Sequence, residues 1–290
     1  MYPKPDHLQR LSELQARLVQ RAGLFSHVRR YFDEHGFIHV ETPVRIAAPA
    51  PEEFIEAPRS GNRFLRCSPE LEMKRLVCAG FEKIYQIGPC FRQDEFGSRH
   101  REEFTMLEWY ETGADYLDLL DFTASMVRSV IPLPVEKITV NEAYLKYTGL
   151  TAAQASEKDI FDELMVEKIE PELGRGCMTF LLDYPASRAS LARLKPGDAS
   201  VAERWELYIN GLELANAYSE LTDAAVQRHR FALECKARAV SGMAAYPEPV
   251  EFLEALECGM PECAGCALGL DRLAMILTDA SDIAQITFPN

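Results

Sequence analysis

The sequence lacks the long apolar segments that membranes require. No window approaches the run of about 18 uninterrupted apolar residues that a membrane-spanning helix needs. The N-terminus has no basic start followed by an apolar stretch, which argues against a secretory signal. Without an export signal, we expect the eight cysteines to be reduced thiols in the cytoplasm.

Positive charge is also in short supply. Lys and Arg total 31 against 45 Asp and Glu, which gives a formal net charge of −14. A surface this acidic repels phosphate backbones, so broad nucleic-acid binding is disfavoured.

A structural zinc site is disfavoured for a different reason. Cys258, Cys263 and Cys266 lie close together, but they lack the paired C-x2-C arrangement of such sites, and no His follows at a ligand distance. We interpret them as small buried residues beside a glycine-rich strand.

What the chain does have is enough apolar content for a large core. With 290 residues, 47% of them hydrophobic, it can form one sizeable domain or one domain with an insert. Apolar periodicity and turn residues locate the elements. Helices are expected at 8–31, with Gly23 denting or dividing the first, and at about 116–130, 223–241 and 250–257. A further helix has Pro69 in its first turn. Strands are expected at 37–40, 63–67, 84–91, 103–110, 179–184, 205–209 and 212–220.

Successive hairpins flanked by helices indicate the fold class. Asn210-Gly211 is a strong hairpin turn pair between two of the strands. Residues 132–176 change character to short, polar, helical segments, which we interpret as an inserted helical subdomain. Residues 264–277 read as a strand running into a helix. The pattern favours an α+β fold with an antiparallel sheet rather than a doubly wound parallel one.

Three segments carry residues suited to chemistry. In the first, Arg92 lies at the end of one strand, and a charged loop connects it to the next strand (EFTMLEWY, 103–110), which carries acidic residues. The arginine can bind a phosphate group while the acids bind an amine. In the second, Glu206 and Glu213 flank the Asn-Gly turn and can hold Mg²⁺ bridging nucleotide phosphates. In the third (GCALGLDRL, 265–273), glycines let a ligand ring approach the backbone and Arg272 can reach a terminal phosphate. Each has a plain alternative, an exposed polar hairpin or a small-residue strand.

Together these segments resemble the signature motifs of class II aminoacyl-tRNA synthetases. VETP at 40–43, the hairpin after Phe91 and GLDR at 269–272 look like motifs 1, 2 and 3. FTMLEWY at 104–110 and SEL at 219–221 narrow the resemblance to the lysyl branch, over most of residues 10–290. The resemblance implies an antiparallel sheet flanked by helices, an ATP-dependent enzyme and a homodimer.

Within that branch the chain resembles tRNA-independent paralogues that attach (R)-β-lysine to elongation factor P. Lysyl-tRNA synthetases carry an N-terminal anticodon-binding domain, whereas here the catalytic domain is expected to begin almost at residue 1. SPE at 68–70, YPASRASL at 184–191 and GMPEC at 259–263 are similar to the paralogues. Ala267 also matches them, where tRNA-charging enzymes have Gly, and its methyl group could discriminate β- from α-lysine. The implied partners are a lysine-like substrate and elongation factor P, without tRNA or membrane.

Residue roles follow from the resemblance, position by position. Arg92 and Arg272 are the expected catalytic pair, on the α- and γ-phosphates of ATP. Several carboxylates in one pocket would suit a substrate with two ammonium groups. The expected ATP-binding residues are Arg92, Gln93, Asp94, His100, Arg101, Glu213, Leu214, Gly269 and Arg272, the Mg²⁺ ligands Glu206 and Glu213, and the substrate-binding residues Ser68, Pro69, Glu70, Glu108, Tyr110, Asn216, Glu220 and Ala267.

Two departures affect the expected ATP contacts. Gln93-Asp94 replaces the usual Asn-Glu, so an adenine contact could shift to Glu95 or to a water. Arg101 adds a positive charge where the family usually has Asn. Two other readings stay open at this stage: a minimal α-lysine-activating enzyme of the lysyl-tRNA synthetase type, and a non-catalytic paralogue that binds an amino acid or nucleotide.

Overall fold

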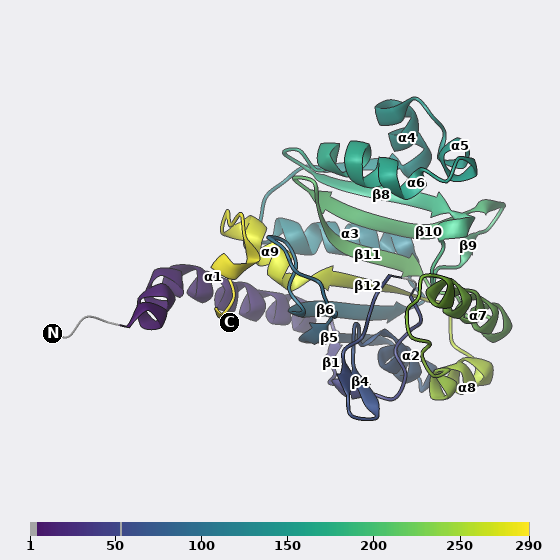
Figure 1. Ribbon diagram of the computed structural model, residues 1–290, viewed down its shortest axis with the longest axis horizontal. Coiled ribbons are helices and arrows are strands. Elements are labelled where there is room, and N and C mark those ends of the chain that lie inside the picture. The colour runs from purple at the N-terminus through teal and green to yellow at the C-terminus, as the bar shows by residue number, and fades with distance from the viewer. Residues whose placement is uncertain (1–4, 53, 290) are drawn as a thin grey trace.

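The computed structural model describes residues 5–52 and 54–289 and is built around one large sheet (Figure 1). The strands of this sheet are β1 (Ile38–His39), β5 (Lys83–Phe91), β6 (Glu103–Thr112), β7 (Val135–Thr139), β8 (Met178–Pro185), β9 (Leu194–Lys195), β10 (Asp198–Ile209), β11 (Leu212–Ser219) and β12 (Cys263–Gly269). A small second sheet contains β2 (Arg45–Ile46), β4 (Arg63–Leu65) and β3 (Arg59–Ser60).

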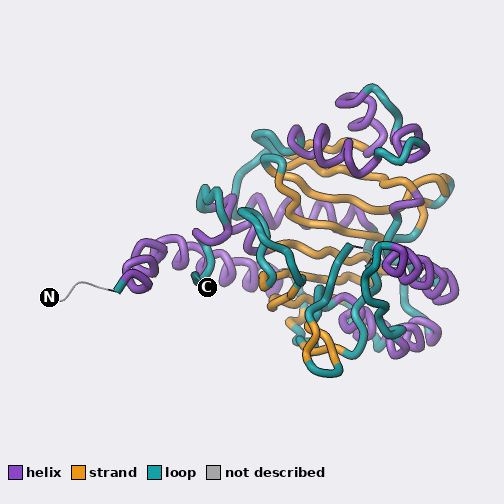
Figure 2. Tube along the Cα trace, viewed as in Figure 1, coloured by secondary structure: helices purple, strands orange, loops and turns teal. Residues whose placement is uncertain are grey.

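Helices surround the large sheet, as Figure 2 shows. They are α1 (Asp6–Glu34), α2 (Glu70–Cys78), α3 (Tyr116–Arg128), α4 (Val140–Thr148), α5 (Ala152–Glu157), α6 (Phe161–Leu164), α7 (Ala224–Val240), α8 (Val250–Cys258) and α9 (Leu270–Leu277). A π-helical turn (Met165–Ile169) and short 3-10 turns (Glu170–Glu172, Ala186–Arg188, Ile283–Gln285) complete the described chain. No helix of the described residues has the length and apolar content to cross a bilayer.

The strand order brings distant segments together. It runs β1-β5-β6-β12-β11-β10-β8-β7, with β9 paired to β10. Every neighbouring pair from β5 to β8 along this order is antiparallel, whereas β1 pairs with β5, and β7 with β8, in parallel. The predicted antiparallel α+β fold is therefore confirmed for the centre of the sheet.

One face of the sheet carries the main core. The alternation along β6 turns Leu107 and Trp109 into a buried cluster with α1 and α3, and leaves Glu108 and Tyr110 on the other face. Trp109 and Trp205 are fully buried within this cluster. Because helices seal this face, the opposite face is the one available for a cavity.

The helix around Gly23 corrects one prediction. Asp6–Glu34 forms a single continuous helix. A glycine costs a helix about 1 kcal/mol relative to alanine, and the burial of Leu24, Val28 and Phe32 along one side outweighs that cost. Gly23 itself lies on the exposed side, where a Cβ would meet nothing within 4 Å.

The segment predicted as a helical insert is helical only in part. Val135–Thr139 is the strand β7, which extends the large sheet through parallel pairing with β8. The helical segments after it pack in a cluster of their own against Leu181, Tyr184 and Tyr208 of β8 and β10. Periodicity missed β7 because the strand is short and carries charged residues on its exposed positions.

Two smaller differences concern element boundaries. β10 begins at Asp198, seven residues before the predicted start at 205, and pairs with the unpredicted β9. Pro69 is the N-cap residue of α2 rather than part of its first turn. The Asn-Gly turn is confirmed, since Asn210 and Gly211 both have positive φ (52° and 66°).

Candidate active site

A row of side chains crosses the open face of the sheet. The register places Gln86, Glu108, Ala267, Asn216 and Glu206 opposite one another on β5, β6, β12, β11 and β10. Directly opposed residues of antiparallel strands point to the same face. The small Ala267 therefore lies in the floor between Glu108 and Asn216, two residues that line the same cavity.

The next row requires a glycine. Gly265 lies opposite Tyr110 on one side and Tyr218 on the other. A Cβ at Gly265 would come within 2.3 Å of Tyr110 Cε1 and 2.4 Å of Glu220 Oε1. We expected the glycines of this strand to admit a ligand ring, and Gly265 instead admits the side chains of Tyr110 and Glu220.

Glu108 lies at the acidic end of the cavity, held by two hydroxyl groups. Ser68 Oγ donates to Glu108 Oε2 at 2.7 Å, and Tyr110 Oη donates to Oε1 at 2.7 Å. Burial raises the pKa of Glu108 to about 8, and the nearby charge of Glu70 adds to the shift. The carboxylate is therefore oriented and costly to keep charged in the absence of a cation.

A buried lysine links two more acids of the cavity. Lys74 Nζ lies 2.6 Å from Glu70 Oε1 and 2.6 Å from Glu220 Oε2, and its side chain is 1% exposed. Oε2 of the buried Glu220 carboxylate is paired with the Lys74 ammonium, whereas Oε1 has no hydrogen-bond partner among the described residues. Burial raises the pKa of Glu220 to about 7. Lys74 was not among the predicted site residues, although its i,i+4 spacing from Glu70 is visible in the sequence.

The opposite end of the cavity is basic. Arg272 donates to Glu213 O at 2.7 Å, and its Nη2 lies 2.7 Å from His100 Nε2. Burial and the charge of Arg272 lower the pKa of His100, so the neutral imidazole accepts the hydrogen bond. These contacts fix the direction of the Arg272 guanidinium.

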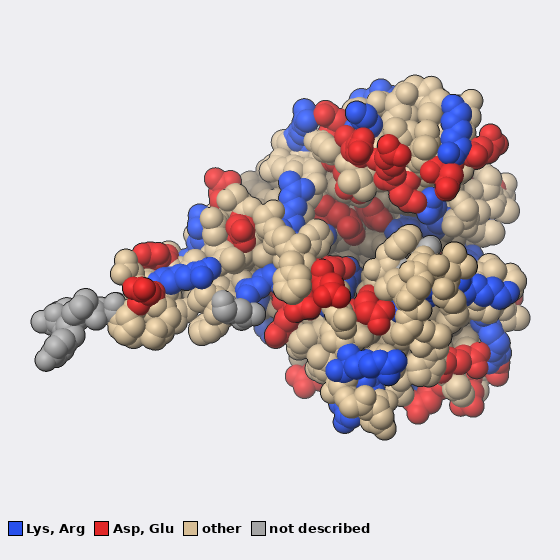
Figure 3. Space-filling model, in the orientation of Figure 1, with Lys and Arg blue, Asp and Glu red and all other residues tan. Residues whose placement is uncertain are grey.

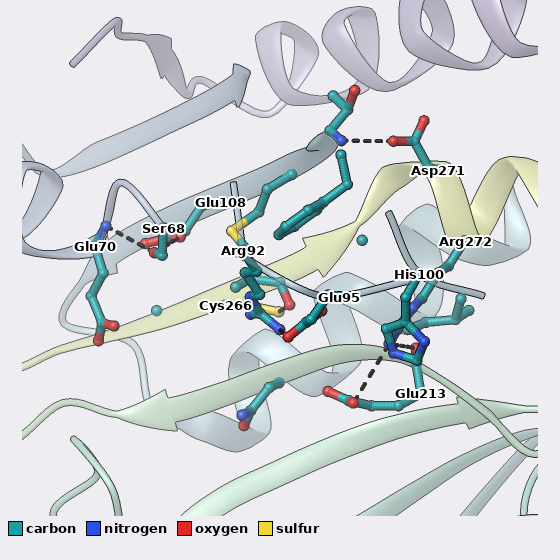
Figure 4. Close-up of a pocket in the computed structure, with 18 of the residues that line it drawn as sticks. Ser68, Glu70, Arg92, Glu95, His100, Glu108, Glu213, Cys266, Asp271 and Arg272 are labelled. Atoms are coloured by element: carbon teal, nitrogen blue, oxygen red, sulfur yellow. Dashed lines mark hydrogen bonds and ion pairs between the residues drawn. The ribbon is translucent and has the colours of Figure 1, made fainter. Parts of the chain in front are cut away.

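Arg92 lies between the two ends. Figure 4 shows Ser68, Glu70 and Glu108 on one side of it, and His100, Glu213 and Arg272 on the other. Its guanidinium stands 5.2 Å from the Phe104 ring centroid and 3.6 Å from Glu95. Arg92 Nε is buried without a hydrogen-bond partner. An anionic ligand would supply the acceptor that this nitrogen lacks.

Most of the predicted site residues line this one cavity. They are Ser68, Glu70, Arg92, His100, Arg101, Glu108, Tyr110, Glu213, Leu214, Asn216, Glu220, Ala267, Gly269 and Arg272. Acidic side chains gather in the hollow that the molecule presents at this position (Figure 3). Arg92 and Glu220 therefore line the same cavity.

Some predicted residues lie elsewhere. Pro69, Gln93, Asp94 and Glu206 are not among the lining residues, and Gln93 and Asp94 are exposed. Glu95, which we named as the alternative contact, does line the cavity.

Arg101 has a second set of contacts outside the cavity. Its guanidinium donates to Thr287 Oγ1 and, at 3.0 Å, to Phe288 O in the C-terminal segment. The positive charge that this position adds is therefore shared with the end of the chain.

Other lining residues were not among the catalytic, binding or metal residues predicted from the sequence. The lining set also includes Glu52, Arg99, Phe104, Thr105, Met106, Tyr218, Gly265, Cys266, Asp271 and Ile283. Asp271 has a clear structural task, since it accepts from Thr105 N at 2.6 Å and from Arg21 Nε at 2.8 Å, which joins α9 to β6 and α1.

The predicted metal carboxylates lie close enough for their charges to interact, but they differ in their contacts. Glu206 accepts hydrogen bonds from Tyr184 and Tyr208 (2.5 and 2.7 Å) and pairs with Arg204 at 2.5 Å. The Glu213 side chain is 42% exposed, and desolvation by the cavity walls together with the charge of Glu206 raises its pKa.

A third acid, Glu170, faces the same two carboxylates. Burial and the charges of Glu206 and Glu213 raise the pKa of Glu170 to about 7. The described residues hold no preformed cluster of three metal ligands. The acids therefore fit Mg²⁺ only in the way this ion is usually bound, through one or two carboxylates together with substrate phosphates.

Comparisons with known proteins agree with this geometry. Residues 6–290 match the family described as tRNA synthetases class II (D, K and N). A curated relative, the elongation factor P–(R)-β-lysine ligase of Proteus mirabilis (strain HI4320), is 37% identical over 308 residues, covering 94% of this chain and 95% of the relative. The chain belongs to the class II (D, K and N) tRNA synthetase family.

Proposed function

We propose that this protein uses ATP to activate (R)-β-lysine as an adenylate and transfers the acyl group to a lysine of elongation factor P. The observation that carries the proposal is the polarity of one cavity, with Arg272 at one end, Arg92 in the middle, and Glu70, Glu108 and Glu220 at the other end. The name and near-full-length similarity of the Proteus relative support the choice of substrate and acceptor.

The first step suits the residues at the centre of the cavity. A substrate carboxylate oxygen attacks the α-phosphorus, a P–O bond forms, and pyrophosphate leaves. Arg92 would stabilise the charge on the α-phosphate through the unpaired Nε and its neighbours, and Arg272, fixed by His100, would hold the γ-phosphate. Phe104 offers a flat apolar face for the adenine ring.

Mg²⁺ is part of the proposal. When bound, it would neutralise phosphate charge and orient the triphosphate. Glu213 and Glu206 would hold it, which requires Glu206 to exchange at least one of its present partners for the metal.

The acidic residues would bind the two ammonium groups of the substrate. Glu220 Oε1 has no hydrogen-bond donor among the described residues, and an ammonium group would supply one. In the second step the ε-amine of the acceptor lysine attacks the acyl carbon, an amide bond forms, a proton is lost and AMP leaves.

Pyrophosphate exchange with α-lysine, (R)-β-lysine and (S)-β-lysine tests the activation step. We expect the highest kcat/KM with (R)-β-lysine. A preference for α-lysine would replace this substrate with the minimal lysyl-tRNA synthetase-like alternative. Absence of exchange with all three, despite binding of ATP and Mg²⁺, would favour the non-catalytic paralogue.

Intact-mass measurement tests the acceptor. Enzyme, ATP, Mg²⁺ and (R)-β-lysine are incubated with elongation factor P, and with a variant factor that lacks the acceptor lysine as the control. We expect one β-lysyl group on the unaltered factor and none on the variant. Exchange activity without any mass gain would remove this acceptor and retain the activation step.

We further propose that the chain works as a cytoplasmic homodimer. β1 lies at the edge of the large sheet, and Ile38 on it is 55% exposed. An exposed apolar residue on a sheet edge suits an interface with a second copy. Light scattering after size-exclusion chromatography would give a monomer mass if the dimer is wrong.

The proposed compartment is supported by the cysteines. All eight are free thiols, which fits a reducing compartment.

A further inference from the structure

The loop between β2 and β3 places an additional carboxylate in the cavity. Glu52 lines it together with Arg92 and Glu70, and neither Glu52 nor its loop was among the predicted site residues. Burial raises the pKa of Glu52 to about 7, and Arg92 is the charged group that acts on it most strongly, followed by Glu70. No hydrogen-bond donor from the described chain reaches this carboxylate. Among the described residues it is therefore an acid without a hydrogen-bond partner, in the same cavity as Arg92.

The position of Glu52 along the cavity differs from that of the other acids. Glu108 is held by Ser68 and Tyr110, and Glu220 lies 2.6 Å from Lys74, at the end of the cavity away from Arg272. Glu52 lines the cavity together with Arg92, and its loop is hydrogen-bonded through Glu56 O to Gln93 N, the residue after Arg92. A substrate whose carboxylate reacts beside Arg92 extends its chain toward Glu108 and Glu220, which we call the distal acids. The amine nearest that carboxylate then falls beside Glu52, and the distal amine falls near Glu108 and Glu220.

A fully buried arginine fixes the backbone of this loop. Arg238 of α7 is 0% exposed, and its Nη1 donates to Glu52 O at 2.6 Å and to Ile55 O at 2.7 Å. Its Nη2 pairs with Glu56 Oε2 at 2.5 Å. The Tyr246 ring lies 3.9 Å from the guanidinium carbon. Burying a guanidinium is costly unless its donors are used, and here they hold the carbonyl group of Glu52 and the chain that follows it, at Ile55 and Glu56.

The same loop is attached to the nucleotide end of the site. Glu56 O accepts a hydrogen bond from Gln93 N at 2.8 Å, one residue beyond Arg92. Tyr246 Oη accepts from Ala57 N at 2.7 Å, which closes the far side of the loop. The loop thus has defined contacts with both α7 and the segment that carries Arg92.

We propose that Glu52 receives the ammonium group nearest the reacting carboxylate, and that Arg238 is the positioning residue that holds Glu52 in place. The inference rests on the proposed function, because it presupposes a diamino acid whose carboxylate reacts at Arg92. Glu52 would then determine whether the enzyme accepts a substrate according to the presence and position of an amine close to the carboxylate. The distal acids alone would accept any chain that ends in an ammonium group.

Two substrate analogues separate Glu52 from the distal acids. 3-Aminohexanoate keeps the amine near the carboxylate of β-lysine and lacks the distal one, and 6-aminohexanoate is the reverse. We expect Glu52→Gln to raise the KM for (R)-β-lysine and the inhibition constant of 3-aminohexanoate about 10- to 100-fold, the size of one lost charge-assisted hydrogen bond. The inhibition constant of 6-aminohexanoate should stay within about twofold of its original value.

Glu254→Gln is the matched control, since it makes the same chemical change on the exposed surface of α8. All three constants should be unchanged in that variant. Equal weakening of both analogues in Glu52→Gln, or no weakening of 3-aminohexanoate, overturns the role of Glu52.

The positioning role of Arg238 has its own readout. Arg238→Met should weaken 3-aminohexanoate selectively, and adding Glu52→Gln to it should produce little further loss, because both changes remove the same contact. Arg238→Lys should recover part of the binding. Independent, multiplicative losses overturn the positioning role. If Arg238→Met fails to fold, the two-analogue comparison in Glu52→Gln still decides the assignment of the amine.

Failure of the inference can be told from failure of the proposed function. If the wild-type enzyme is active and Glu52→Gln weakens 3-aminohexanoate and 6-aminohexanoate equally, only the inference about Glu52 is overturned. If the wild type prefers α-lysine, the comparison is made with 2-aminohexanoate in place of 3-aminohexanoate, and the same outcomes decide it. A wild type that forms no adenylate with any lysine isomer overturns both.

Discussion

Replacing Lys74 with methionine tests the buried charge cluster most directly. The lysine side chain is 1% exposed and lies 2.6 Å from both Glu70 and Glu220. Methionine keeps the approximate length and apolar stem but removes the cation. Two carboxylates then remain without their compensating charge, and one of them, Glu220, is 2% exposed. Removing one partner of a buried ion pair costs about 3–5 kcal/mol because it leaves an uncompensated charge.

This cost predicts a measurable change in melting temperature. The entropy of unfolding is about 2.1 cal/mol/K per residue, or about 0.6 kcal/mol/K for 290 residues. A loss of about 3–5 kcal/mol therefore lowers Tm by about 5–8 °C at pH 8. The loss should be smaller at pH 6, because Glu220, with its pKa already raised to about 7, can take up a proton and remove the stranded charge. The difference between the two pH values is at most about 2.7 kcal/mol per proton.

Lys83→Met provides the matched control. Lys83 pairs with Glu111 at the same 2.6 Å distance, but its side chain is 41% exposed, so we expect a loss of about 1 kcal/mol or less. Calorimetry of both variants at pH 6 and pH 8 measures the effect. A Lys74→Met loss that equals the Lys83→Met loss, or that does not depend on pH, would refute the reasoning.

Four further predictions concern residues of the cavity. Gly265→Ala should raise the KM for the amino acid at least about tenfold and leave the KM for ATP unchanged, because the new Cβ would collide with Tyr110 and Glu220. Steady-state exchange kinetics at varied concentrations of amino acid and ATP measure the two KM values, and an equal rise in both would contradict the prediction. The pKa values of Glu108 and Glu220, raised to about 8 and 7, mean that the folded chain holds protons that the unfolded chain has released, so the free energy of unfolding should fall as pH rises from about 5 to 8. A diammonium substrate should then release protons on binding near pH 7, which calorimetry in buffers of different ionisation enthalpy measures, and proton uptake would contradict it. Glu213→Gln should increase the Mg²⁺ concentration needed for half-maximal exchange, and EDTA should abolish exchange in both proteins; an unchanged Mg²⁺ requirement would remove Glu213 from the metal site.

The sequence by itself determined the elements whose signals are local. Asn210-Gly211 gave the hairpin turn because both positions need positive φ, and few other residues adopt that conformation easily. The alternation along β6 turned Leu107 and Trp109 inward and left Glu108 and Tyr110 for the cavity. The acids and arginines of the three motifs were recognisable because each motif is contiguous in the chain.

Only the tertiary structure decided which of those residues meet. Strand order places β12 between β6 and β11, so Ala267 stands between Glu108 and Asn216, residues separated by more than 100 positions. The contacts of Glu206 with Tyr184 and Arg204 depend on the packing of β8 against β10, which no local pattern encodes.

The residues that sequence reasoning missed share one physical feature: their partners are distant or their surroundings are irregular. Glu52 belongs to a loop without periodicity, and its placement depends on Arg238, which lies 186 positions away. From the sequence, Lys74 is indistinguishable from a lysine on the surface of a helix, whereas in the structure it is buried between two acids. Burial sets the pKa and the available partners of such groups, and burial is a property of the whole fold rather than of the neighbouring sequence.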